Sequence, residues 1–253
     1  MAITHPEAKP HERMSMFLVP ANTPGVNILK NVKVLGEPGD EGNSAYIHYE
    51  NVRVPADHIL GEPGGAFKIS QTRLEGGRIH HAMRIVAQVK LAFDMMCERV
   101  LSRETQGELL AKKQMVQEQI ADSWIEMEQF RLLVLRTAWR IDKYKDYLKV
   151  RKDIAAVKVA MAKVLHDVVY RSLHIHGALG CTDELPLAQL WYEIPIMGIA
   201  DGPDEVHKVT VARQVLREYE PAPGEWPTQH LPPLREAARE KFAHLLELEV
   251  GNL

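Results

Sequence analysis

The sequence has little of what marks an extracellular, membrane-spanning or redox-motif protein. Its two cysteines, Cys97 and Cys181, lie far apart and form no CxxC pair, which favours a reducing compartment over a disulfide framework. No apolar run approaches membrane-spanning length, and the N-terminal MAITHPEAKPHERM resembles neither a signal peptide nor a transit peptide. We therefore expect a cytoplasmic protein with no membrane span.

An excess of charge of one sign is also lacking. With 31 Lys and Arg against 34 Asp and Glu, the net charge is −3, so no global field recruits nucleic acid or an anionic membrane. What the sequence has instead is hydrophobic content, 45% over 253 residues, which is enough for a sizeable core in one large or two small domains.

The first part of the chain predicts β structure over residues 14–62. MSMFLVP is a short strand ended by proline, ANTPG is a turn, and SAYIHYENVRVP alternates before another proline. Three or four strands without a second layer would expose their edges and an apolar face. Residues 1–62 are therefore predicted to be a partial β domain that needs a partner.

From about Ala66 the hydrophobic period becomes helical. Apolar faces recur over 82–96, 120–141 and 154–168, and a fourth helix is predicted from Pro203 to about Tyr219. The connections, such as RETQGELL and KDYLK, are short. The predicted fold is therefore mainly α, a four-helix bundle over residues 63–220 that follows the partial β domain.

Residues 221–253 differ in composition from the bundle. The Pro-rich stretch EPAPGEWPTQHLPP leads to a polar final helix predicted over 234–248. This segment is expected either to dock on a partner subunit or to stay mobile.

One segment, Ile199 to His207 (IADGPDEVH), places an acid and a glycine in a turn before a new helix. Asp201 could be a helix N-cap that accepts backbone N–H bonds. Alternatively, the apolar residues upstream, from Leu190 to Ile199, could shield the carboxylate from water and make it a competent general base. The local sequence leaves both readings open.

The phrases ADGPDEVH and GRIHHAMR, together with VRVPADHILGEPGGAFKI, resemble the second half of the acyl-CoA dehydrogenase family over roughly residues 14–220. The resemblance is strongest to the branch of family members ten and eleven. It implies that a helical domain and the first half of the β domain would precede residue 1. It also implies that Asp201 takes the place of the glutamate that removes the substrate α-proton.

The resemblance implies a second catalytic residue, Arg78, which matches the arginine near the catalytic carboxylate and would hold the geometry of the acid. Gly77 occupies the position of the catalytic glutamate in the isovaleryl and long-chain branches. Glycine there leaves Asp201 as the one matching base.

An FAD site is implied by further matches. Arg103 corresponds to an arginine that reaches the flavin pyrophosphate of a neighbouring subunit, and Gln114 matches a glutamine in the same loop. LHIHGALGC matches a glycine turn against the adenosine end of the flavin, where Gly177 and Gly180 keep the pattern and His174 replaces a glutamine.

Several positions depart from the family pattern. Gln106 replaces an aromatic residue, and Pro203 and Glu205 replace a threonine and a polar residue that contact flavin. Proline has no N–H to donate there. His174, His176 and Cys181 lack a convincing fourth metal ligand, so we predict no metal site.

The resemblance implies α,β-dehydrogenation of a fatty acyl-CoA thioester, with an electron-transfer flavoprotein or similar acceptor as partner and a homodimer or tetramer as the assembly. Three alternatives remain: a nitroalkane-oxidase-like flavoenzyme, which also uses an aspartate base, a non-catalytic subunit or fragment, and a generic helical interaction module.

Overall fold

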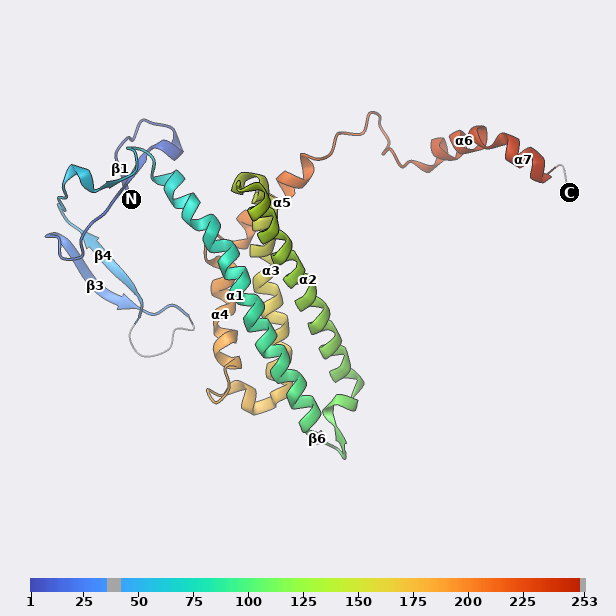
Figure 1. Ribbon diagram of the computed structural model, residues 1–253, viewed down its shortest axis with the longest axis horizontal. Coiled ribbons are helices and arrows are strands. Elements are labelled where there is room, and N and C mark those ends of the chain that lie inside the picture. Colours follow the sequence, from blue (N-terminus) through green and yellow to red (C-terminus); the bar gives the residue numbers. More distant parts are fainter. Residues whose placement is uncertain (36–41, 251–253) are drawn as a thin grey trace. The chain divides into compact units, whose positions relative to one another are not determined.

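The computed structural model describes residues 1–35 and 42–250, which form two compact units, Met1–Ala212 and Arg213–Leu253. The first unit contains short strands and a set of long helices, so the predicted mainly α fold with a partial β region is confirmed (Figure 1). Residues 36–41 and 251–253 of the predicted first and last segments lie outside the described residues.

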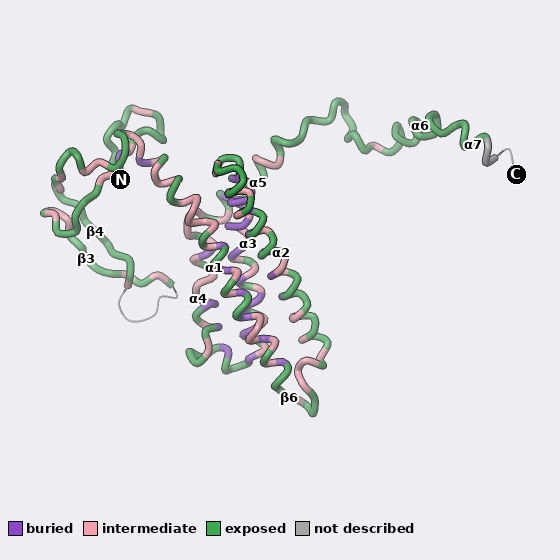
Figure 2. The backbone as a smooth tube through the Cα atoms, viewed as in Figure 1, coloured by how far each residue is buried: buried purple, intermediate pink, exposed green. Residues whose placement is uncertain are grey.

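The β region consists of two small antiparallel sheets. One joins β1 (Ala2–Ile3), β2 (Met14–Phe17) and β5 (Ile59–Leu60), and the other is a hairpin of β3 (Val26–Val32) and β4 (Ser44–Tyr49) with a bulge after Ile28. Most residues of the hairpin are exposed, as the green tube in Figure 2 shows. The described strands of this hairpin therefore leave both faces largely exposed, and that a partner layer covers them stays a prediction.

Three long helices follow: α1 (Ala66–Ser102), α2 (Gln114–Tyr144) and α3 (Tyr147–His176). A hairpin of β6 (Glu104–Thr105) and β7 (Glu108–Leu109) links α1 to α2 through Gln106 and Gly107, both in the left-handed region. The α2 to α3 connection is two residues long. Lys145 adopts the left-handed conformation, and the Asp146 side chain caps α3 by accepting from the Leu148 N–H at 2.9 Å.

The fourth helix of the bundle is α4 (Leu187–Ile199), which the sequence had indicated only as a short apolar segment. Although Pro195 lies inside it, Leu187, Leu190 and Met197 join the buried core. The helix predicted to begin at Pro203, α5 (Asp204–Leu216), buries only His207 among its residues. The bundle core is therefore built by α1 to α4.

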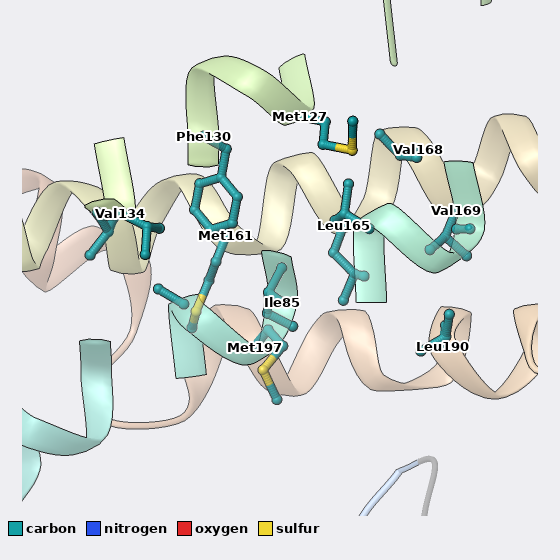
Figure 3. Close-up of a cluster of buried hydrophobic side chains, with 14 of the residues drawn as sticks. Ile85, Met127, Phe130, Val134, Met161, Leu165, Val168, Val169, Leu190 and Met197 are labelled. Atoms are coloured by element: carbon teal, nitrogen blue, oxygen red, sulfur yellow. The ribbon is translucent and has the colours of Figure 1, made fainter. Parts of the chain in front are cut away.

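This core combines aliphatic side chains with methionines and an aromatic ring (Figure 3). Side chains from all four helices meet in it, among them Ile85 from α1, Phe130 from α2, Leu165 from α3 and Met197 from α4. Their mutual burial stabilises the bundle and fixes the helix ends that carry polar residues.

The second unit contains α6 (Leu231–Lys241) and α7 (Ala243–Val250), which meet at Phe242 where one helix had been predicted over 234–248. The Pro-rich stretch before α6 is exposed. Among the described helices, none is long and apolar enough to cross a membrane.

Candidate active site

Asp201 lies in the tight turn between α4 and α5, with φ of 57°, followed by Gly202 with φ of 106°. A non-glycine residue in the left-handed region costs about 1 kcal/mol or more and persists only where its surroundings impose it. Three polar side chains from other parts of the first unit supply that constraint.

Two of these side chains hold the backbone carbonyl of Asp201. Arg78 Nε of α1 donates to it at 3.0 Å, and His207 Nε2 of α5 donates at 3.2 Å. Burial lowers the pKa of both groups, while the charge of Asp201 opposes this shift at Arg78. Arg78 therefore contacts the backbone of the proposed base, and both residues line a cavity of about 190 Å³.

The third side chain, Lys158 of α3, is fully buried. Its Nζ donates to the Gly198 carbonyl at 2.9 Å and to Asp204 Oδ1 at 2.6 Å. Because Gly198 closes α4 and Asp204 opens α5, Lys158 fixes both ends of the Asp201 turn. Sequence reasoning missed it, although a lysine between Ile154 and Met161 in an apolar stripe was a signal.

The carboxylate of Asp201 lies against α1. Its side chain is 10% exposed, and Oδ2 is buried with no hydrogen-bond partner among the described residues. A Cβ at Gly77 would lie 2.8 Å from Oδ2, so the carboxylate occupies the space that a side chain would fill. The N-cap interpretation is therefore not supported, and a buried carboxylate oxygen with a free lone pair is what a general base requires.

A second cluster surrounds the C-terminal end of α1. A cavity of about 600 Å³ is lined there by Arg103, His174 and Gly177, three of the residues predicted to bind cofactor. A cavity of about 490 Å³ shares His174 and Gly177 with it and is lined by the aromatic rings of Tyr170 and Trp191.

Two lining residues of the larger cavity were not predicted from sequence. Arg99 Nε and Gln119 Oε1 are buried and have no hydrogen-bond partner within the described part of the chain. Arg99 lies one turn before Arg103 on α1, which was an available signal. Native proteins rarely leave such atoms unpaired, so an ordered water or a ligand that pairs with them is expected.

The other predicted cofactor residues are not among those that line either cavity. Gly180 is buried, and its Cβ would lie 2.6 Å from the Leu173 carbonyl, so helix packing already requires glycine there. Gln114 is exposed at the first position of α2, and Pro203 and Glu205 are exposed at the start of α5. The described residues contain no cluster of His, Cys, Asp or Glu suited to a metal ion.

Comparisons with known proteins agree with this architecture. Residues 64–216 match the family model "Acyl-CoA dehydrogenase, C-terminal domain". The chain is 43% identical to the probable acyl-CoA dehydrogenase FadE2 of Mycobacterium tuberculosis, over 85% of this chain and 53% of that protein. It is 38% identical to acyl-CoA dehydrogenase family member 10 of Mus musculus, over 86% of this chain and 20% of that protein.

Solved structures give the same result. Butyryl-CoA dehydrogenase from Megasphaera elsdenii has a TM-score of 0.72 and 28% identity, covering 80% of this chain and 52% of that one. The FAD complex of PigA, at 20% identity, shares the fold with a TM-score of 0.73, covering 83% and 53%. The chain thus spans about half the length of the bacterial proteins it matches.

Proposed function

Since the chain belongs to the acyl-CoA dehydrogenase family, we propose that it carries the catalytic base for α,β-dehydrogenation of an acyl-CoA thioester. The base is Asp201, with Arg78 as the residue that holds its backbone. The observation that carries the proposal is the nearly buried carboxylate, whose Oδ2 is free to accept a proton.

The residues at the end of α1 fit the FAD that this family uses. The guanidinium groups of Arg99 and Arg103 suit phosphate oxygens, and the unpaired Arg99 Nε and Gln119 Oε1 offer a donor and an acceptor. The aromatic cavity that adjoins them at His174 suits a planar ring. When bound, FAD supplies the hydride acceptor that no amino-acid side chain provides.

The chain's own residues would deal with the proton. Asp201 receives the α-proton on its carboxylate. The Asp201 side chain is only 10% exposed, so the surrounding residues largely shield it from water. Aspartate is one methylene shorter than glutamate, so its placement must be tight. The bonds from Arg78 and His207 to its carbonyl, and from Lys158 to both ends of its turn, meet that demand.

The same family relationship supports two proposals about partners. An electron-transfer flavoprotein or similar acceptor would take up the electrons. A homodimer or tetramer would form, because the resemblance gives Arg103 a role toward the flavin of a neighbouring subunit.

The test compares the parent chain with Asp201→Asn after incubation with FAD. Flavin binding is read from the visible spectrum, and reduction is followed anaerobically with acyl-CoA thioesters and, separately, with nitroalkanes. Loss of the base is expected to slow reduction by acyl-CoA by a factor on the order of 10² to 10⁴.

Each other outcome contradicts the proposal in a different way. Near-parental rates in Asp201→Asn would remove Asp201 as the base. Reduction by nitroalkanes but not by acyl-CoA would assign the chain to a nitroalkane-oxidase-like reaction. A chain that takes up no flavin would favour a non-catalytic subunit or a fragment.

A further inference from the structure

Three residues of α1 lie in a column that faces the Asp201 carboxylate. Arg73, Gly77 and His81 are spaced four residues apart, so successive turns of the helix bring them to one side. The carboxylate lies over the middle position, where glycine leaves room for it. The two flanking side chains reach its two oxygens, Arg73 Nη1 at 3.9 Å from Oδ1 and His81 Nε2 at 3.6 Å from Oδ2.

The two flanking contacts differ in strength. The Arg73 side chain is 78% exposed, so water and salt screen its charge. The His81 side chain is 27% exposed and lies near Oδ2, the oxygen that is buried and unpaired. His81 is thus the better shielded of the two partners. The adjacent His80 is exposed.

The surroundings of His81 define which ring nitrogen carries the proton. Arg84 Nη2 lies 3.4 Å from His81 Nδ1, and a guanidinium can only donate, so Nδ1 accepts. The ring proton is then on Nε2, which faces Asp201. Burial lowers the pKa of His81, the charges of Arg84, His80 and Arg73 lower it further, and the charge of Asp201 opposes them.

We propose that His81 is a positioning residue for the base: a neutral imidazole, oriented by Arg84, that donates Nε2–H to Asp201 Oδ2 in the substrate complex. A neutral donor fixes the rotation of the carboxylate and stabilises its charged form. It does so with less loss of basicity than a cation at the same place would cause. The donor keeps its own proton throughout. This inference rests on the proposed function of Asp201.

The first test needs no flavin. In the full chain labelled with ¹⁵N-histidine, His81 is assigned by the loss of its signal in His81→Gln. We expect a neutral Nε2–H ring at pH 7 and, in Asp201→Asn, a lower pKa for His81, because the opposing negative charge is gone. An Nδ1–H ring, a charged ring, or a His81 signal unchanged by Asp201→Asn would overturn the proposal.

The second test uses a matched pair of variants in the flavin-loaded chain. His81→Phe keeps a ring but removes the donor, whereas His81→Gln keeps a neutral N–H. In His81→Phe the acidic limb of the pH–rate profile for flavin reduction is expected to move up by about one pH unit, and His81→Gln is expected to restore it. Equal profiles in the two variants would overturn the proposal, since a purely structural role would not separate them. Failure of the proposed function itself would appear instead as unimpaired reduction in Asp201→Asn.

Discussion

The two ends of the bundle differ in how far their buried polar groups are paired. The end with the Asp201 turn is called the paired end, and the end with the cavity at the C-terminus of α1 is called the cavity end. At the Asp201 turn, Arg78, His207 and Lys158 pair with the backbone or with Asp204, and Asp201 Oδ2 is a buried atom without a partner among the described residues. At the end of α1, Arg99 Nε and Gln119 Oε1 line a cavity of about 600 Å³ and have no partner in the part of the chain that the structure describes. This difference indicates that the chain's own side chains hold Asp201, the proposed base, whereas the cavity at the end of α1 has polar atoms that a bound molecule can pair.

The largest expected effect is on the stability of the paired end. Asp204→Leu leaves the ammonium of Lys158 buried and without its carboxylate, which should lower the free energy of unfolding by about 3–5 kcal/mol in urea titrations. Lys158→Met should cost less, because the Asp204 side chain it leaves behind is 20% exposed. The double variant should be more stable than Asp204→Leu alone, since no unpaired charge remains. If Asp204→Leu cost no more than Lys158→Met, the buried ion pair would not be what fixes the turn.

Substitutions at two neighbouring glycines of α1 test whether the position of the Asp201 carboxylate matters. Gly76→Ala places its Cβ in open space and should raise stability by up to about 1 kcal/mol, the usual gain of alanine over glycine in a helix. Gly77→Ala places its Cβ 2.8 Å from Asp201 Oδ2, so the flexible carboxylate must move. A displacement of about an ångström should slow flavin reduction by acyl-CoA by roughly 100-fold. Equal rates in the two variants would show that the carboxylate position is not critical.

The variants Arg99→Met and Gln119→Leu test whether the cavity end binds flavin. Each removes an unpaired buried polar atom, so thermal unfolding should be unchanged or slightly later. Flavin affinity, titrated by fluorescence quenching, should fall about 10-fold for the arginine because a charge-assisted hydrogen bond is lost. Arg131→Met, at an exposed residue paired with Glu128 on α2, is the control and should leave affinity unchanged. Unaltered affinity in Arg99→Met would mean that the cavity does not hold the flavin.

The sequence predicted α1 to α3 because their apolar residues recur with a helical period against polar faces. It did not predict α4, since a nearly all-apolar segment with Pro195 inside has no polar face to reveal a period. The proximity of Arg78 to Asp201 was predicted from the family resemblance. For Lys158 the sequence offered only a lysine inside an apolar stripe, which signals a buried charge but does not show that its partners are Gly198 and Asp204.

The smallest expected effect is a pH dependence of the free energy of unfolding that comes from His207 at the paired end. Burial lowers the pKa of His207 below its ordinary value of 6.5, so the unfolded chain takes up protons first as pH falls. The stability that depends on neutral His207 is thus complete above about pH 6.5 and is lost as pH falls below it. His207→Gln can still donate to the Asp201 carbonyl but does not titrate, so its free energy of unfolding should fall less between pH 7.5 and 5 than that of the parent. Arg99→Met, at the cavity end, should keep the parental dependence of the free energy of unfolding on pH. A His207→Gln slope equal to the parental one would place the acid sensitivity outside the Asp201 turn.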